Sequence, residues 1–509
     1  MLSKANRGVS VAAEPVWSVD PRTGKAREQV AVEASAEEID QAVRAAHGAR
    51  AALADRTARA ALLRAAADLL DAAAEHVIEA ADAETALGPT RLTGELARTT
   101  GQLRLFADAV DEGSFLDVRI DRPDQDRTPP WPDLRRMKIP LGVVAVYAAS
   151  NFPLAFSVPG GDTASALAAG CPVVVKAHPY HPATSELCAS LLRRAAAEVG
   201  LPEDVVVLVH GFDAGVELIR HPLVAAAGFT GSVEGGRALH DAAAARPVPI
   251  PFHGELGSLN PVVVTAAAAE ERGADIGAGL AASMTLGEGQ FCTKPGFVLA
   301  PSGEAGDRLV SALTDAVSET EPGVMLSQRM RGAFLTATYE LAILPGVTAP
   351  VHPGPGGPYT VNAGFLAIDA RTLLEEGYRT PLMECFGPVT MVVRYASREE
   401  VTSVLALVPG SLTATLQAAE EDPEAASLLA ELAPLAGRVL VNGWPTGVAV
   451  APAQHHGGPY PATTSTSTSV GTTAVERWLR PITYQSTPDH LLPPELRDDN
   501  PLGLPRRES

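Results

Sequence analysis

The sequence predicts an α/β protein built on parallel sheets. Short apolar runs rich in Val recur between Pro140 and Glu255 and alternate with helix-like segments. Strands that are apolar on both faces and are joined by helices are typical of a parallel sheet covered on both sides. Apolar residues make up 46% of the 509 residues and charged residues 20%, so large cores are possible and a disordered chain is not expected. A chain of this length holds roughly two to four domains.

The region before this alternation is expected to be mostly helical. Ser35 followed by Glu37 and Glu38 is a typical helix start. From there to about Val110 the chain is rich in Ala, Leu, Glu and Arg, with apolar residues at helical spacing. Residues 111–139 are polar and proline-rich between two short extended pieces. They form either a solvated loop or a protruding hairpin used in subunit contact.

From Pro140 onward, strands and helices alternate. We expect strands over residues 141–147, 172–176, 205–209 and 224–230, and helices over 162–169, 185–199, 214–220 and 233–244. Ligands of such sheets bind beyond the carboxyl ends of the strands. Asn151, Lys176 and the Gly231-Ser232 turn all follow strands, so they are the first candidate site residues.

A second sheet-and-helix unit is expected to begin near Glu255. Its strands are predicted at 262–264, 297–300, 389–395, 412–416 and 438–442, and its helices at 276–286, 307–319 and 399–408. Residues 320–375 are rich in Gly and Pro and allow no assignment, and 451–475 are loop-like. A last strand is predicted at 479–485.

Charge and cysteine usage exclude several classes of protein. The net charge of −20 argues against a sequence-independent nucleic-acid binder and against an anionic membrane surface as partner. The four cysteines are scattered without a C-x-x-C spacing, so neither a disulfide scaffold nor a metal site is expected, and a reducing compartment is. Neither a signal-peptide pattern nor an uninterrupted run of ~18 apolar residues is present. We therefore expect a soluble cytoplasmic protein.

Cys292 is the cysteine whose position suggests chemistry. It lies in a short polar, glycine-rich connection, Gly287 to Gly296, between a helix-like run and a strand-like run. A thiol on such a turn can face a cleft, whereas a thiol inside either flanking run would be packed. Because free cysteine is commonly buried and inert, position alone leaves both interpretations open.

Each residue at the strand ends also has two interpretations. Lys176 can hold a ribose or a phosphate, or it is a surface lysine with a packed stem. Gly231-Ser232 opens a helix, whose free N–H groups favour phosphate, but its spacing is not the G-x-G-x-x-G fingerprint and a plain turn explains it too. Asn151 can donate a hydrogen bond into a cleft, or it serves the Asn-x-Pro turn.

Two carboxylates complete the set of candidates. Glu255 follows an apolar stretch, and restricted solvent would raise its pKa and make it a base. Glu384 precedes a strand, next to Cys385, which is expected to be a packing residue. The alternative for both glutamates is a solvated surface carboxylate.

The order of these residues resembles that of the aldehyde dehydrogenase superfamily. The matching series is Asn151, Lys176, Gly231-Ser232, Glu255, Cys292, Glu384, Phe386 and Asn442. The likeness runs from about residue 15 to 485. The segments Gly289 to Thr293, Glu255 to Pro261 and Glu384 to Pro388 are jointly specific. The resemblance implies the aldehyde dehydrogenase-like fold, with a Rossmann-like cofactor domain, an α/β catalytic domain and a small oligomerisation element.

The resemblance also implies domain bounds and an oligomer. The cofactor-binding domain is expected over 1–115 and 140–255, and the catalytic domain over 256–450. Residues 116–139 and 451–509 would supply the oligomerisation element and C-terminal tail, so a homodimer or homotetramer is expected.

By the same resemblance, each candidate has a role. Cys292 attacks the aldehyde, Asn151 and the Cys292 backbone N–H hold the oxyanion, and Glu255 activates water to hydrolyse the thioester. Lys176 and Gly231-Ser232 bind the adenosine ribose and the pyrophosphate. Glu384 holds the nicotinamide ribose, with Phe386 near the ring. No metal is needed.

A narrower resemblance points to a substrate class. Residues 152–167, 456–464 and 479–485 resemble the branch that contains 2-oxoglutarate semialdehyde (2,5-dioxovalerate) dehydrogenases and NADP-linked fatty aldehyde dehydrogenases. The expected function is therefore oxidation of 2-oxoglutarate semialdehyde to 2-oxoglutarate. A fatty aldehyde dehydrogenase, an enzyme that passes the acyl group to coenzyme A, and a non-catalytic protein of the same fold are the alternatives. Hydrolysis is favoured over acyl transfer because Glu255 is present.

Two departures from the family pattern affect these expectations. Ser150 stands where a Trp usually precedes the Asn. Pro179 stands where many NAD-preferring members carry a Glu that accepts both ribose hydroxyls. With no carboxylate at that position to repel a 2′-phosphate, the sequence favours NADP, with NAD also possible.

Overall fold

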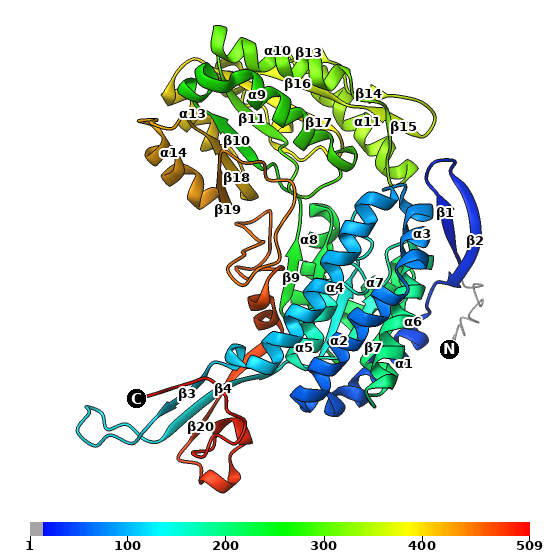
Figure 1. Ribbon diagram of the computed structural model, residues 1–509, viewed down its shortest axis with the longest axis vertical. Helices are drawn as coiled ribbons and strands as arrows, with labels where there is room; N and C mark the ends of the chain where they lie inside the picture. Colours follow the sequence, from blue (N-terminus) through cyan, green and yellow to red (C-terminus); the bar gives the residue numbers. More distant parts are fainter. Residues whose placement is uncertain (1–13) are drawn as a thin grey trace, which may run out of the picture.

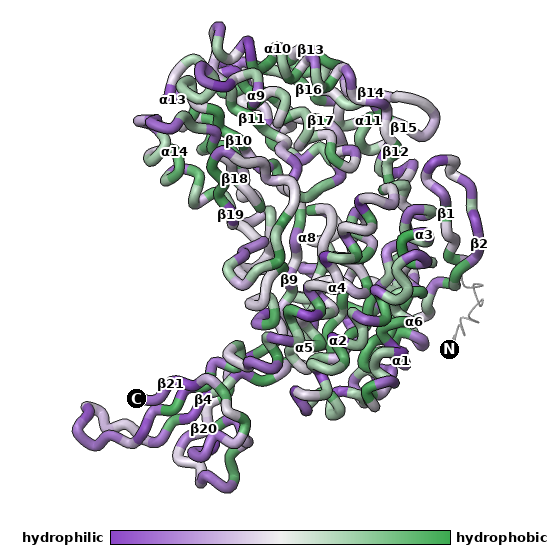
Figure 2. The backbone as a smooth tube through the Cα atoms, viewed as in Figure 1, coloured by the Kyte–Doolittle hydropathy of each residue, from purple (hydrophilic) through white to green (hydrophobic). Residues whose placement is uncertain are grey.

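The structure is a computed structural model that describes residues 14–509 (Figure 1). Two α/β lobes lie one above the other in Figure 1, and a two-stranded ribbon extends from the lower lobe. Hydrophobic segments recur inside both lobes, while the tip of the ribbon is hydrophilic (Figure 2). Within residues 14–509, no helix is long and apolar enough to span a membrane.

The lower lobe contains the predicted parallel sheet. Its strand order is β7-β6-β5-β8-β9, and all pairs are parallel. The strands are β5 (Val143–Tyr147), β6 (Val173–Lys176), β7 (Val206–Val209), β8 (Val224–Thr230) and β9 (Phe252–Glu255). The connecting helices are α5 (Gly161–Ala169), α6 (Pro182–Glu198), α7 (Phe212–Arg220) and α8 (Val233–Ala244). The alternation predicted from Pro140 onward is confirmed.

A block of helices covers this sheet, as its amphipathic pattern predicted. They are α1 (Ala36–Ala49), α2 (Arg56–Ala72), α3 (Ala74–Thr85) and α4 (Pro89–Glu112). Ser35 and Glu38 form a reciprocal capping box at the start of α1. Before it, β1 (Pro15–Asp20) and β2 (Lys25–Val32) form an antiparallel hairpin that the sequence did not reveal. Most of its side chains are exposed, so it lacks the apolar alternation that marks a half-buried strand.

The upper lobe contains a mixed sheet of order β13-β16-β17-β11-β10-β18-β19, parallel except for β13. Its strands are β10 (Pro261–Val264), β11 (Phe297–Pro301), β13 (Thr348–Val351), β16 (Gly364–Asp369), β17 (Val389–Tyr395), β18 (Ser411–Gln417) and β19 (Ala436–Val441). Its helices are α9 (Ala266–Thr285), α10 (Glu304–Ser318), α11 (Gln328–Ala342), α12 (Ala370–Glu376), α13 (Arg398–Leu405) and α14 (Ala425–Leu432). The predicted strands are confirmed.

Residues 320–375, which the sequence left unassigned, hold several of these elements and a small sheet besides. That sheet pairs β12 (Gly323–Val324), β15 (Thr360–Asn362) and β14 (Gly354–Pro355). The chain here turns often, so no apolar run is long enough to signal its strand from sequence.

The extending ribbon belongs to a separate four-stranded sheet of order β20-β4-β3-β21. It consists of β3 (Val118–Asp121), β4 (Leu134–Pro140), β20 (Leu479–Gln485) and β21 (Arg506–Glu508). Of the two alternatives for residues 111–139, the protruding hairpin is the one observed (Figure 1). Its use in subunit contact stays a prediction.

Candidate active site

The parallel sheet brings several predicted residues to one edge. Glu255 and Lys176 are the last residues of β9 and β6, and Gly231 follows β8 directly. Because all five strands are parallel, their carboxyl ends lie on the same side of the sheet. The Gly231 N–H also donates to the Glu255 carbonyl at 3.0 Å, which ties the phosphate-type turn to the carboxylate strand.

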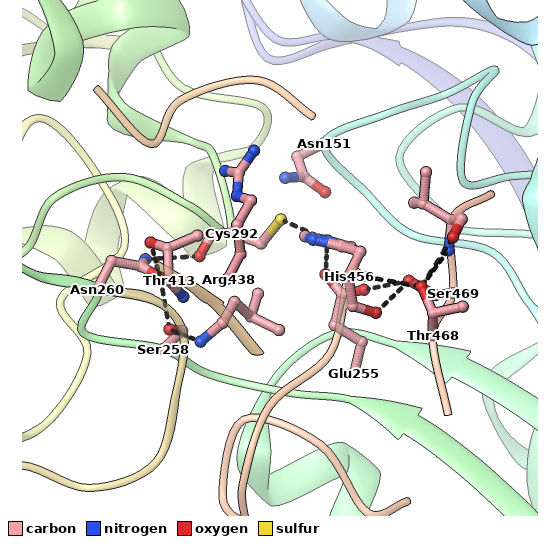
Figure 3. A network of polar contacts seen from close by, with 12 residues as sticks. Asn151, Glu255, Ser258, Asn260, Cys292, Thr413, Arg438, His456, Thr468 and Ser469 are labelled. Atoms are coloured by element: carbon pink, nitrogen blue, oxygen red, sulfur yellow. Dashed lines mark hydrogen bonds and ion pairs between the residues drawn. The ribbon is translucent and has the colours of Figure 1, made fainter. Parts of the chain in front are cut away.

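Cys292 lies in the loop that joins α9 to β11, between the strands of the lower lobe and those of the upper lobe. Its side chain is neither fully buried nor exposed, and its Sγ lies 3.7 Å from Nε2 of His456 (Figure 3). The loop is held from behind by Asn260, whose Nδ2 donates to the carbonyls of Cys292 (2.8 Å) and Lys294 (2.9 Å). The thiol is therefore presented from a fixed backbone rather than from a loose turn.

Asn260 connects this loop to the sheet of the upper lobe. Its backbone has φ = 53°, a left-handed conformation that Asn tolerates better than most residues. Its Oδ1 accepts hydrogen bonds from Ser258 Oγ (2.7 Å) and Thr413 Oγ1 (2.9 Å). One buried amide thus fixes the cysteine loop against β18.

Glu255 is held in a buried network. His456 Nε2 lies 3.0 Å from one carboxylate oxygen, and Ser469 Oγ donates to the other at 2.9 Å. Since a carboxylate only accepts, Nε2 carries the hydrogen of the first contact. His456 is 1% exposed and stands between the sulfur of Cys292 and Glu255, as Figure 3 shows.

The pKa of Glu255 is shifted in the direction opposite to the sequence prediction. Burial does raise the pKa, but the charge and hydrogen bond of His456 and the hydroxyl of Ser469 oppose burial, and the net shift is downward. The prediction was wrong because these partners come from residues 456–469, which nothing in the local sequence of Glu255 indicates. Glu255 is therefore ionised and ready to accept a proton at neutral pH.

The pKa of the Cys292 thiol is shifted in the opposite direction, upward. Burial raises the pKa of Cys292 well above its ordinary value, and the negative charges of Glu255 and Glu384 add to this, while Arg98 opposes it. The resting cysteine is a thiol, so its attack requires a base that takes the proton.

Asn151 also reaches this point. Its Nδ2 donates to the carbonyl of Gln290 at 2.9 Å, and the side chain points toward Cys292 (Figure 3). The backbone N–H of Cys292 donates no hydrogen bond to residues 14–509. The Cys292 N–H and the second hydrogen of the Asn151 amide are therefore available as donors.

Two of the expected cofactor residues lie at the sheet edge. Burial lowers the pKa of Lys176 to about 8, against an opposing effect of Glu33. Ser232 caps α8 by accepting the Gly235 N–H at 3.2 Å, so the first N–H groups of this helix remain without intrahelical partners.

Glu384 and Phe386 come from the upper lobe and are partly buried. Burial raises the pKa of Glu384 to about 7, although the nearby Lys294 opposes that shift. An added methyl group on Gly257 would lie 2.8 Å from the Glu384 carboxylate, so Glu384 sits directly over the Glu255 segment. Lys294 in turn donates to the carbonyls of Cys385 and Val389 at 2.8 and 2.7 Å.

The comparisons with known proteins agree with this geometry. A sequence profile described as the aldehyde dehydrogenase family matches residues 9–337. The chain belongs to the aldehyde dehydrogenase family. It is an oxidoreductase that acts on aldehydes, and members of this family use NAD or NADP.

Named relatives are similar over most of the chain. An α-ketoglutaric semialdehyde dehydrogenase 2 from Azospirillum brasilense is 49% identical over 88% of this chain and 86% of its own. An α-ketoglutaric semialdehyde dehydrogenase from Acinetobacter baylyi is 43% identical over 93% and 91%. The superfamily resemblance and its branch are thereby confirmed.

Solved structures share the fold. A putative aldehyde dehydrogenase from Burkholderia cenocepacia gives a TM-score of 0.80 at 23% identity, covering 95% of this chain and 96% of that one. An NADP-dependent glyceraldehyde-3-phosphate dehydrogenase from Bacillus halodurans, solved with NADP, gives 0.80 at 22% identity over 93% and 96%. The expected aldehyde dehydrogenase-like fold is confirmed.

Sequence reasoning missed the residues that surround the nucleophile. The sequence indicates His456 only as part of the segment 456–464 that resembles the narrower branch, and Asn260 only as part of the Glu255 to Pro261 segment. Asn442, in contrast, lies away from the thiol: its Oδ1 accepts from Arg272 and from the Ala418 N–H. Glu255, Cys292 and His456 also place one potential metal ligand each within 4.8 Å, so the expectation of no metal is untested.

Proposed function

We propose that this aldehyde dehydrogenase oxidises 2-oxoglutarate semialdehyde to 2-oxoglutarate, with Cys292 as nucleophile. The observation that carries the chemistry is the row of Cys292, His456 and Glu255, in which the sulfur lies 3.7 Å and the carboxylate 3.0 Å from the same imidazole nitrogen. The substrate is supported by the two relatives that are 49% and 43% identical and carry that activity in their names.

The first half-reaction forms a thioester. The Cys292 thiol gives its proton to the Glu255 carboxylate, and the sulfur bonds to the aldehyde carbon, which turns the carbonyl oxygen into an oxyanion. The Asn151 amide and the Cys292 N–H donate to that oxyanion, and one such donor is typically worth ~3–4 kcal/mol. Bound NAD(P) supplies the acceptor for the hydride that then leaves this carbon.

The second half-reaction releases the acid. Glu255 first returns its proton to solvent. It then takes a proton from a water molecule, whose oxygen bonds to the thioester carbon. The carbon–sulfur bond breaks, and its electron pair stays on the Cys292 sulfur. Cys292 is ready for another cycle once the acid departs. The hydrogen bonds from His456 and Ser469 hold the Glu255 carboxylate in place for both proton transfers.

The residues present fit a dinucleotide cofactor. The capped start of α8 offers unpaired N–H groups to a pyrophosphate, as expected for Gly231 and Ser232. Lys176, at the end of β6, would hold the adenosine ribose. Glu384, with Phe386 beside it in the chain, would accept the hydroxyls of the nicotinamide ribose, because its half-buried carboxylate faces the Glu255 segment.

The choice between NAD and NADP depends on a carboxylate from outside the parallel sheet. Pro179 led the sequence to favour NADP. Glu33, just after β2, is however the charge near Lys176 that partly opposes the fall in the pKa of Lys176 caused by burial. Glu33 also accepts the Phe212 N–H at 3.3 Å and closely covers Gly211, whose φ of 116° suits glycine. A carboxylate here can accept ribose hydroxyls and would repel a 2′-phosphate. We therefore favour NAD.

This cofactor proposal is tested by exchanging one atom. Glu33→Gln is expected to raise the ratio of kcat/KM for NADP to that for NAD by about tenfold, because it removes the repulsion between the Glu33 carboxylate and the 2′-phosphate of NADP. A tenfold change corresponds to ~1.4 kcal/mol. Glu28→Gln, an exposed residue of β2, is the control and should leave the ratio unchanged. An unchanged ratio in Glu33→Gln would refute the role of Glu33.

A fatty aldehyde dehydrogenase is the second candidate, because three aromatic rings lie beside the nucleophile. Phe152 contacts Phe156 and Phe291 at ring-centroid distances of 5.5 and 5.2 Å. Such a cluster can line an apolar passage. An aldehyde panel separates the candidates: the proposal requires a kcat/KM for 2-oxoglutarate semialdehyde well above that for hexanal or decanal, and the reverse order would refute it.

A further inference from the structure

Arg98 of α4 is a half-buried cation without a hydrogen-bond or ion-pair partner in residues 14–509. Its side chain forms no hydrogen bond or ion pair with any residue of the described range 14–509, and its Nε and Nη2 are closed off from solvent. Burial lowers the pKa of Arg98, which reflects the cost of this desolvation. An unpaired buried charge is costly, so such a side chain is expected to have an anionic ligand that is not part of the chain.

Arg98 is directed at the reaction site. Its Cζ lies 5.0 Å from the centroid of the Phe156 ring, and that ring lies 6.1 Å from the ring of His456. Arg98 is also the cation whose charge opposes the rise in the pKa of Cys292. The Phe156 ring therefore lies near both the Arg98 guanidinium and the imidazole that contacts the nucleophile.

The other arginines around the site are already engaged. Arg91, on the same face of α4, donates from Nη2 to the Asn151 carbonyl at 2.6 Å and stacks between the rings of Phe152 and Phe291 at 5.0 and 4.6 Å. Arg438 donates to the carbonyls of Pro445 and Gly447. Each donates hydrogen bonds that hold a segment of the site in place, whereas Arg98 contacts the Phe156 ring but donates no hydrogen bond within residues 14–509.

The nearest acidic residue on α4 does not neutralise Arg98. Glu95 Oε1 accepts the N–H groups of Leu154 and Ala155 at 2.8 and 3.0 Å, and its Oε2, like Nε and Nη2 of Arg98, has no hydrogen-bond partner in residues 14–509. Burial raises the pKa of Glu95, which favours its uncharged form. The charge of Arg98 thus remains available to a ligand.

We propose that Arg98 binds the carboxylate at the far end of the aldehyde substrate and so selects short oxo-acid aldehydes over uncharged ones. This rests on the proposed function and deepens it. The planar guanidinium matches a carboxylate in two parallel hydrogen bonds, which are strong where water is excluded. 2-Oxoglutarate semialdehyde carries its carboxylate a short carbon chain, ~5 Å long, from the aldehyde carbon. The aldehyde can then reach Cys292 while the carboxylate meets Arg98.

Paired kinetics with two aldehydes test this proposal. Arg98→Met should raise KM for 2-oxoglutarate semialdehyde by about 10- to 100-fold, as loss of a hydrogen bond between charged groups predicts. Its kcat/KM for pentanal should fall at least about tenfold less than its kcat/KM for the oxo-acid, because pentanal loses only the effect of the Arg98 charge on Cys292. Arg98→Lys should recover part of the loss for the oxo-acid only. Arg104→Met, on the same helix but in exposed ion pairs with Asp68 and Asp71, is the matched control.

A second measurement does not depend on turnover. Glutarate, a dicarboxylate of the same length without an aldehyde, should protect Cys292 from alkylation in the wild type and in Arg104→Met, and at least tenfold less well in Arg98→Met. Equal losses for both aldehydes, or equal protection by glutarate, would overturn the assignment of Arg98. A wild type that oxidises pentanal but not the oxo-acid would refute the proposed substrate and, with it, this role. A wild type that oxidises neither would refute the proposed function itself.

Discussion

At the scale of single residues, the site depends on how distant side chains change Cys292 and Glu255. The sequence identified both residues because each lies in a recognisable segment. It missed His456 and Ser469, since a histidine or serine in a polar loop has no periodic pattern that marks it as buried. Their effect is large enough to reverse the expected shift in the pKa of Glu255. Sequence motifs identify the reacting residues, whereas the pKa values of those residues depend on side chains that only folding brings close.

The thiol provides a test at this scale. Because the negative charge of Glu255 raises the pKa of Cys292, Glu255→Gln should move the pH midpoint of Cys292 alkylation to lower pH. The rate should still increase with pH in both proteins, since only the thiolate reacts. The rate of modification by iodoacetamide, with Cys292 followed by peptide mass, gives the two midpoints. A midpoint that stays in place or moves upward would contradict the electrostatic account.

At the scale of elements, the cysteine loop is positioned by one buried amide. Asn260→Asp keeps the shape of the side chain but replaces the donor to the Cys292 and Lys294 carbonyls by an oxygen. We expect a loss of stability of about 1–3 kcal/mol, as for a buried group left without its partner, together with a lower kcat.

Matched thermal melts and turnover numbers check this expectation. Ser258→Ala, which removes one hydrogen bond to the same amide but leaves the loop carbonyls satisfied, is the control and should retain most of the activity. If Asn260→Asp lost stability without any loss of kcat, the loop would not depend on this contact.

The elements also show which parts of the fold can be predicted from local hydrophobic periodicity. Strands β5 to β8 and helices α1 to α8 follow the sequence pattern closely, because their apolar residues recur at regular spacing. The hairpin β1–β2 and residues 320–375 do not. The hairpin is exposed, and the latter region is made of short strands between frequent turns. Both are fixed by tertiary contacts rather than by their own periodicity.

At the scale of the whole molecule, the sheet β20-β4-β3-β21 is the feature that a single copy leaves unexplained. It projects from the lower lobe, with β20 at one edge (Figure 1). A strand edge offers unpaired backbone groups, which a second copy can satisfy. The sequence-based expectation of a homodimer or homotetramer through residues 116–139 and 479–485 stays a proposal, since one chain does not show its partner.

Mass measurements test the oligomer. Light scattering should give at least twice the mass of one chain for the full protein. Replacing residues 123–132 at the ribbon tip by a short Gly-Ser turn should preserve the circular dichroism spectrum while weakening the assembly. A full-length protein that is monomeric at micromolar concentration would rule out the proposed element.

The central claim is that Glu255 hydrolyses a thioester on Cys292. Rapid mixing of Glu255→Gln with aldehyde and NAD(P) tests it most directly. The account predicts one equivalent of reduced cofactor per site, formed more slowly than in the wild type because water must take the thiol proton in place of Glu255, then a stall of at least about a hundredfold in turnover, with the acyl group found by mass on Cys292. Steady turnover at the wild-type rate, or a burst with no acyl group on Cys292, would contradict it.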